Sequence, residues 1–413
     1  MRRMLLAAVL LVVLFSVGLA GASSSAGSVQ ARGLIGLGAP GGLVDSGCGV
    51  CWWPQPRQSW CSNGSVSDAQ APSPANVEQL ALAWSYRPYG GVGQPIVYAA
   101  PDMRRPYVYV VADSYAGAGD KRLRALDLAT GKLRWKVTAE RDVLVTPVAD
   151  SGMLFDGGGG YLRRYEPRSG QIVWQRKIPE GRGTPFEVVA DGSVYMSGGR
   201  DVLAFDAQTG RVRWHRSFGG FLDCWPYGCG LAVLAGRVYT AGDFGVRALD
   251  AQTGETLWVG RTKERGLSQA VAGDRVFVET TSSIEAFRAS DGKHLWHATP
   301  GGSPSADATQ VVYLAGEVLY ALDATSGKLR WQVQIGDSLT RPALANGLVW
   351  AGDDTGRLVA LDASNGQRLW HSRPFLTKEG APDGPIEPVV AGEYVLVETT
   401  VADGLIAYHV PTR

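Results

Sequence analysis

The chain has 413 residues, of which 45% are hydrophobic and 19% charged, so it can bury a large core. Its 40 basic and 39 acidic residues leave a net charge of only +1, which lacks the basic excess needed to neutralise phosphates, so we expect no nucleic-acid partner. The 54 glycines and 13 tryptophans favour many short strands joined by tight turns.

Residues 1–22 have the pattern of a secretory signal peptide. Arg2 and Arg3 supply the positive start, Met4 to Ala20 is apolar, and Ala20-Gly21-Ala22 provides small residues for cleavage. Without cleavage, the same segment would be an anchor helix. We expect export with cleavage, no remaining membrane span, and a mature chain located in a periplasm or outside the cell.

Residues 23–78 form a segment rich in Gly, Ser and Pro, without repeats. It contains Cys48, Cys51 and Cys61, which cannot all pair among themselves. In an oxidising compartment disulfides are the default for such cysteines, and half of a zinc site at the first two is the alternative. Three nearby tryptophans suggest that residues 48–78 pack onto the domain that follows.

From residue 79 to residue 413, one pattern recurs: two apolar residues and Asp, two or three residues, Thr/Ser-Gly, three residues, then Trp. The first copy is Ala125-Leu126-Asp127 with Thr130-Gly131 and Trp135. Five copies are clear and two are degenerate, and their tryptophans are 35 to 44 residues apart: Trp135, Trp174, Trp214, Trp258, Trp296, Trp331 and Trp370. A period near forty with strand-like content is typical of a β-propeller.

The chemistry of the motif explains its residues. The apolar pair ends the third strand of a blade, the acid bonds turn amides, and Gly supplies a positive φ. Trp then lies on the fourth strand and packs against the neighbouring blade. We therefore interpret the repeated acids as turn residues and predict no metal site.

Two incomplete pieces predict an eighth blade. Residues 394–399 and 405–409 have the pattern of second and third strands, with no Thr-Gly-Trp after them. Trp84 lies on an isolated strand near the start. Pairing this first strand with the last blade completes an eight-bladed β-propeller of four-stranded antiparallel blades and removes an open edge. The alternative is a seven-bladed ring with a separate C-terminal hairpin.

A distinctive loop interrupts the repeats between Cys224 and Cys229, which we expect to form a disulfide. Trp225 and Tyr227 lie between them. Aromatic side chains in a short closed loop make a rigid contact surface for a partner. The alternative is a disulfide that only holds together an extended connection between blades.

The first strand of each blade begins beside the central channel. Aligning a recurring Pro-Val-Ala-like segment places one residue per blade at the channel mouth: Gln94, Thr146, Glu187, Leu231, Ser268, Ser303, Arg341 and Glu387. Apart from the leucine, we interpret these as ligand candidates, with Arg341 binding a carboxylate or quinone oxygen and a glutamate binding a cation. The alternative is a solvated channel with ordinary polar lining.

These repeats resemble the tryptophan-docking repeats of the pyrroloquinoline quinone (PQQ) propeller superfamily over residues 80–410. The run Ser73-Pro74-Ala75-Asn76-Val77-Glu78-Gln79-Leu80-Ala81-Leu82-Ala83-Trp84 is similar to the segment that opens the first blade in quinoprotein dehydrogenases and exported PQQ-like proteins. The superfamily includes both alcohol dehydrogenases and non-catalytic scaffolds such as the BamB outer-membrane assembly factors, so the resemblance implies the fold more firmly than the activity.

The sequence departs from the dehydrogenases in ways that favour a scaffold. It has no adjacent cysteines, its repeats leave little room for insertions with calcium ligands, and Cys48-Gly49-Val50-Cys51 is followed by Trp52 instead of the His of a haem motif. We predict a monomeric, non-catalytic module without cofactor that binds a protein, a peptide or another envelope component. The alternatives are an oxidoreductase dependent on PQQ and calcium and a purely structural surface module.

Overall fold

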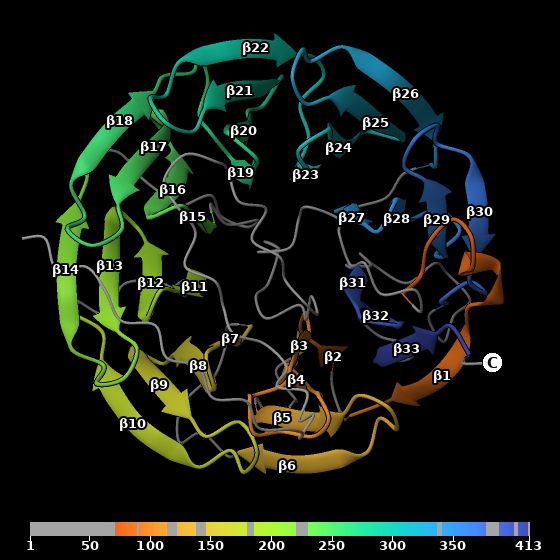
Figure 1. Ribbon diagram of the computed structural model, residues 1–413, viewed down its shortest axis with the longest axis horizontal. Helices are drawn as coiled ribbons and strands as arrows, with labels where there is room; N and C mark the ends of the chain where they lie inside the picture. Colours follow the sequence, from red (N-terminus) through yellow and green to blue (C-terminus); the bar gives the residue numbers. More distant parts are fainter. Residues whose placement is uncertain are drawn as a thin grey trace, which may run out of the picture. The chain divides into compact units, whose positions relative to one another are not determined.

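The computed structural model describes residues 71–88, 91–113, 122–137, 146–179, 186–219, 230–336, 341–376, 388–399 and 404–411, all within the unit Ser46–Arg413. They form eight antiparallel sheets arranged as the blades of a ring (Figure 1). The prediction of an eight-bladed propeller is confirmed. The signal peptide, the five cysteines, Trp225, Tyr227 and Glu387 lie outside the described residues.

The first four blades follow the chain from its N-terminal side. Blade 1 contains β2 (Gly91–Val92), β3 (Ile96–Tyr98), β4 (Tyr107–Asp113), β5 (Arg122–Asp127) and β6 (Leu133–Val137). Blade 2 contains β7 (Val148–Asp150), β8 (Met153–Gly158), β9 (Tyr161–Tyr165) and β10 (Ile172–Lys177). Blade 3 contains β11 (Phe186–Ala190), β12 (Ser193–Gly198), β13 (Asp201–Asp206) and β14 (Val212–Ser217). Blade 4 contains β15 (Leu231–Leu234), β16 (Arg237–Gly242), β17 (Gly245–Asp250) and β18 (Thr256–Gly260).

The remaining blades complete the ring. Blade 5 contains β19 (Ser268–Ala272), β20 (Arg275–Glu279), β21 (Ile284–Arg288) and β22 (His294–Ala298). Blade 6 contains β23 (Ser305–Ala306), β24 (Gln310–Ala315), β25 (Val318–Asp323) and β26 (Leu329–Gln334). Blade 7 contains β27 (Ala343–Ala345), β28 (Leu348–Gly352), β29 (Leu358–Asp362) and β30 (Arg368–His371). Blade 8 contains β31 (Pro388–Ala391), β32 (Tyr394–Glu398), β33 (Leu405–His409) and β1 (Ala81–Tyr86).

Blade 8 joins the two ends of the chain. β1 pairs with β33 from Ala81 opposite His409 to Tyr86 opposite Leu405. The indole nitrogen of Trp84 donates to the Leu128 carbonyl oxygen of blade 1 at 2.7 Å. The predicted pairing of the N-terminal strand with the last blade is therefore confirmed, and the alternative of seven blades plus a hairpin is wrong.

The same indole contact recurs around the ring. In seven blades, the Trp on the outer strand donates to a carbonyl oxygen of the next blade at 2.7–3.1 Å: Trp84, Trp135, Trp174, Trp214, Trp258, Trp296 and Trp331. Trp370 instead lies edge-on to Tyr408, with ring centroids 5.3 Å apart. Blade 8 has no turn between its third and fourth strands, because these strands come from opposite ends of the chain.

The turn of each motif supplies the surface on which the indole lies. The Asp127 carboxylate accepts from the Thr130 amide at 3.0 Å and from its hydroxyl at 2.8 Å, which fixes the reversal. Gly131 follows with a φ of 67° and lies directly against the Trp84 ring. Each of the seven donating indoles thus covers the glycine of the next turn, where a side chain would collide with it.

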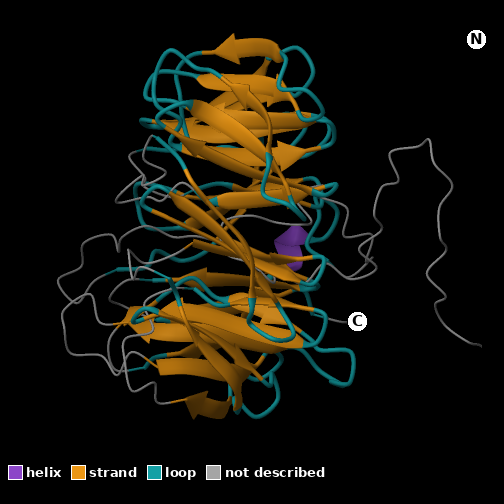
Figure 2. Ribbon diagram, turned by 90° about the vertical axis from the view of Figure 1, so that its left-hand side faces the viewer, coloured by secondary structure: helices purple, strands orange, loops and turns teal. Residues whose placement is uncertain are grey.

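The core lies between the blades. The described residues form eight buried apolar clusters, one for each pair of neighbouring blades. The short helix η1 (Val77–Gln79) lies against the strands in Figure 2. Val77 and Leu80 are buried in the cluster between blades 7 and 8, and the Asn346 amide donates to the Pro72 carbonyl at 2.9 Å. Residues 71–80 therefore belong to the folded ring.

Candidate functional site

The innermost strands surround the centre of the ring (Figure 1). The sequence predicts the channel mouth at the first residues of these strands. In blade 5 this position is Ser268, which pairs with Glu279 at the end of β20. In blades 1, 2, 6 and 7 the pairing of the first and second strands can be continued beyond the strand ends to the position equivalent to Ser268. The residues at this position are Gln94, Thr146, Ser303 and Arg341. The residues that the alignment on proline identified therefore share one level of the ring.

Blades 3 and 4 differ from the sequence alignment by one position. In blade 3, Phe186 pairs with Ser197 and Glu187 with Met196, so the level of Ser268 belongs to Phe186. In blade 4, Leu231 pairs with Thr240, so Leu231 lies one residue further into the strand than the position equivalent to Ser268. Neither strand carries the proline that follows Gln94, Thr146, Ser303 and Arg341 in their blades. Successive strand residues point to opposite faces, so a shift of one position places a different side chain at this level.

The predicted positions in blades 5 and 6 are in direct contact. The Ser268 hydroxyl donates to Oε2 of Glu279 at 2.6 Å, and its oxygen lies 3.2 Å from the Ser303 hydroxyl. Because the Ser268 proton is used on the carboxylate, the Ser303 hydroxyl donates to Ser268. The three side chains form a chain of hydrogen bonds that runs from Ser303 of blade 6 through Ser268 to the Glu279 carboxylate of blade 5.

Burial sets the electrostatics of this relay. It raises the pKa of the Glu279 carboxyl above its usual value, an effect that the Ser268 hydrogen bond and the charge of Arg341 partly oppose. Arg341 is half-buried and belongs to blade 7. The structure therefore brings together Ser268, Ser303 and Arg341 from the predicted set and adds a carboxylate that was not predicted.

Glu279 was missed because the alignment considered only innermost strands. Its signal was nonetheless present: Arg275-Val276-Phe277-Val278-Glu279 is a buried strand that ends on a carboxylate. Tyr394-Val395-Leu396-Val397-Glu398 has the same ending in blade 8. A charged residue at the last position of an apolar second strand lies level with the channel mouth, because the two inner strands pair antiparallel.

The other predicted positions are separate from this group. Gln94 of blade 1 is 7% exposed, and its side-chain oxygen has no hydrogen-bond partner in the described part of the chain. Thr146 of blade 2 is half-buried. The side chain of Glu187 is not among those described. No described contact connects these three positions to Ser268 or Arg341.

Further polar contacts join the inner strands of neighbouring blades. The Gln269 side chain donates to the Gly230 carbonyl and accepts from the Ala241 amide, which ties blade 5 to blade 4. The Leu344 amide donates to the Ser305 hydroxyl at 3.2 Å, which ties blade 7 to blade 6. Polar contacts thus connect the innermost strands of neighbouring blades from blade 4 to blade 7.

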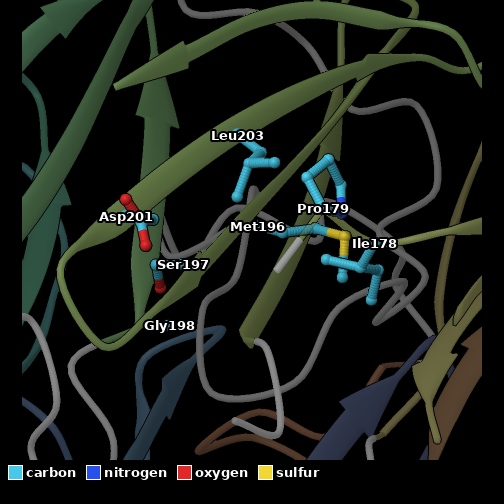
Figure 3. Close-up of a pocket in the computed structure, with 7 residues that line it drawn as sticks. All are labelled: Ile178, Pro179, Met196, Ser197, Gly198, Asp201 and Leu203. Atoms are coloured by element: carbon cyan, nitrogen blue, oxygen red, sulfur yellow. The ribbon is translucent and has the colours of Figure 1, made fainter. Parts of the chain in front are cut away.

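A small hollow lies apart from this group, between blades 2 and 3 (Figure 3). Its volume of about 20 Å³ holds little more than one water molecule. The residues that line it are Ile178, Pro179, Met196, Ser197, Gly198, Asp201 and Leu203. A hollow of this size does not hold an organic cofactor.

Replacing Glu279 with Gln is expected to stabilise the fold at neutral pH. Because the folded-state pKa is raised, the stability linked to Glu279 is fully present below the unfolded pKa of about 4.3 and is lost as pH rises through the folded pKa. Glutamine cannot ionise, and its oxygen still accepts from Ser268. Thermal unfolding should show a higher midpoint for the variant at pH 7 than for the parent, and equal midpoints near pH 4. A variant less stable than the parent at pH 7 would contradict this account.

Comparison with known proteins places the chain among propellers of the same fold. A family model described as outer membrane protein assembly factor BamB matches residues 81–220, 225–309 and 280–410. The chain belongs to this family. The crystal structure of BamB from Moraxella catarrhalis superposes with a TM-score of 0.61 at 15% identity, covering 80% of this chain and 97% of that one, which shows the common fold.

Two sequence relatives indicate how widely the fold is used. BamB of Bordetella pertussis is 30% identical over 92 residues, 21% of this chain and 24% of that protein. Quinohemoprotein alcohol dehydrogenase ADH-IIG of Pseudomonas putida is 28% identical over 331 residues, 62% of this chain and 40% of that enzyme. The matches span less than half of either relative. The resemblance to BamB-like and quinoprotein-like propellers is thus confirmed.

Two further findings concern the described residues alone. They contain no group of three or more His, Cys, Asp or Glu side chains placed to hold a metal ion. Within the same ranges, no helix combines the length and apolar character needed to cross a bilayer.

Proposed function

We propose that this chain is an exported propeller without catalytic activity that binds a protein, a peptide or another component of the cell envelope, in a periplasm or outside the cell. The observation that carries the proposal is that polar residues predicted to bind a ligand at the channel mouth form hydrogen bonds with neighbouring blades. Ser268, Ser303 and Glu279 bond one another across two blades, which stabilises the ring. Membership of the BamB family supports a binding role, and the signal-like N-terminus supports export.

The test is addition of PQQ and calcium to the purified protein. We expect no quinone absorption band and no reduction of an electron-accepting dye with alcohols or sugars as substrates. A quinone spectrum together with dye reduction would overturn the scaffold proposal. Capture of one envelope protein by the full chain, at stoichiometric ratio and without turnover, would support it.

A dehydrogenase is the second candidate, because the match to the quinohemoprotein alcohol dehydrogenase covers 62% of this chain. PQQ with calcium would supply its redox chemistry. Arg341 would be the side chain for a quinone oxygen or carboxylate. The glutamates predicted to bind a cation, Glu187 and Glu387, have side chains outside the described part of the chain. If PQQ binds, Arg341→Ala should weaken that binding, and equal affinity would show that Arg341 does not contact it.

A further inference from the structure

The outer strands of blades 1, 2 and 3 form a continuous arc on the edge of the ring. β6, β10 and β14 are each the last strand of their sheet, so each has one edge without a partner strand in the described structure. They follow one another from the bottom to the left side of Figure 1. We call these three strands the basic rim.

The basic rim differs from the other outer strands in charge. It carries Arg134, Lys136, Arg176, Lys177, Arg213 and Arg216, and neither Asp nor Glu. The other five outer strands, β18, β22, β26, β30 and β1, carry Arg330 and Arg368 only. A chain with nearly equal numbers of acidic and basic residues thus concentrates positive charge on three neighbouring edges.

Part of this charge is neutralised locally. Arg134 pairs with Asp127 at 2.5 Å and Arg213 with Asp206 at 2.7 Å. On the opposite arc, Arg368 likewise pairs with Asp353 at 3.4 Å. Asp127 and Asp206 are turn carboxylates of the repeat, whereas Asp353 lies in the turn between β28 and β29. All three pairs leave little net charge.

Four basic residues of the rim form no ion pair with the described residues. Arg176 and Arg216 donate to backbone carbonyls of Thr209 and Thr253 at 2.9 and 2.7 Å, which fixes the guanidinium groups without neutralising them. Lys136 and Lys177 are exposed. Carbonyl oxygens carry no net charge, so the positive field of these four side chains reaches solvent.

The same strands expose apolar side chains. Leu133, Ile172, Val173 and Val212 are 41–51% exposed. The outer strands β1, β18 and β26 also expose one leucine each, so charge, and not apolar exposure, distinguishes the rim. Within the rim, β10 carries two of the exposed apolar side chains together with Arg176 and Lys177. Exposed aliphatic groups beside cationic groups on an open strand edge match an extended peptide that alternates apolar and acidic residues.

Protection of the edges against self-association is the competing explanation. Natural sheets place Lys and Arg on edge strands to prevent pairing with other copies. Protection would be needed on all outer strands, yet β1, β18 and β22 carry no Lys or Arg. Among the other outer strands only β26 carries a basic residue without an ion pair to the described residues, Arg330, whereas the basic rim carries four. This concentration favours a partner over protection.

We propose that the basic rim, centred on β10, binds an acidic, extended segment of a protein partner. The segment adds as a strand to the free edge of β10, its carboxylates face the basic side chains and its aliphatic residues contact Ile172 and Val173. This assignment rests on the proposed binding function and specifies its surface and the chemistry of its partner.

The probe is a fluorescent twelve-residue peptide of alternating glutamate and valine, with a lysine–valine peptide and heparin as comparisons. We expect the full chain to bind the acidic peptide, more weakly at high salt because ions screen exposed charges. The double variant Lys136→Glu, Lys177→Glu should lose at least ~10-fold in affinity, about 1.4 kcal/mol. The matched control is Lys293→Glu, Lys328→Glu on the opposite arc, which should bind like the parent.

Four results would overturn the proposal. Equal losses in both double variants would show a general charge effect, and binding of heparin without the acidic peptide would indicate a polyanion site. Self-association that the rim variant abolishes would indicate a second copy as occupant. If an envelope protein captured by the parent still binds the rim variant equally, the binding function stands and this surface is wrong.

Discussion

A chain that begins at Gly91 is expected to lose the cooperative unfolding transition of the whole ring. It lacks β1, so blade 8 keeps three strands and β33 exposes an unpaired edge. It also loses Trp84, which is buried between blades 8 and 1 and bonds Leu128. Because each buried cluster is formed by two neighbouring blades, separating blades 8 and 1 exposes an apolar face of both blades to water.

The expected cost is large relative to a typical stability of 5–15 kcal/mol. Removing one buried tryptophan costs about 3–5 kcal/mol, and the truncation removes the rest of the strand as well. Residues 71–80 add to the loss, since Val77 and Leu80 are buried against blades 7 and 8.

Calorimetry of two chains makes the comparison. The reference begins at Ala71 and retains β1, and the test chain begins at Gly91. We expect one sharp transition for the reference, and a broad, low-temperature transition or association through the β33 edge for the test chain. Equal midpoints would mean that the ring does not depend on the pairing of its ends.

Replacing Gly254 with Ala is expected to destabilise the protein by about 2–4 kcal/mol. Gly254 has a φ of 70°, which costs a residue with a side chain about 1 kcal/mol or more. An added Cβ would also lie 2.6 Å from Cδ2 of Trp214, so the indole must leave its position against the turn. Displacing a large packed side chain adds about 1–3 kcal/mol.

Gly236 of the same blade provides a matched control. Its φ is 71°, yet an added Cβ would meet no atom within 4 Å. Gly236→Ala therefore reports the backbone cost alone, and the difference between the two variants in urea unfolding measures the indole contact. Equal losses would show that the tryptophan adapts freely and that docking contributes little.

The repeat allowed the number of blades and the closure of the ring to be predicted because both depend on local chemistry. The spacing of Asp127, Gly131 and Trp135 describes one turn and one outer strand, and a pattern of this kind needs no knowledge of distant residues. Trp84, which had no motif of its own, was interpretable because a ring without an open edge has one place for it.

A second aromatic series escaped the sequence analysis. Tyr195, Tyr239 and Phe277 lie on second strands, each with its ring centroid 5.8–5.9 Å from the Trp on the outer strand of its own blade. Each precedes that Trp by nineteen residues. This constant spacing was available as a signal, but its meaning depends on which faces of two strands look toward the same neighbouring blade.

The sequence by itself determined the repeat, the turn chemistry, the eight blades and the level of Gln94, Thr146, Ser303 and Arg341, because periodic patterns and proline landmarks are local. Only the tertiary structure decided that Phe186 takes the level assigned to Glu187, and that Glu279 joins Ser268 and Ser303. Register is a property of paired strands, and a shift of one residue reverses the face of every side chain. Contacts between blades likewise join residues some 35 positions apart, which the order of residues within one repeat does not specify.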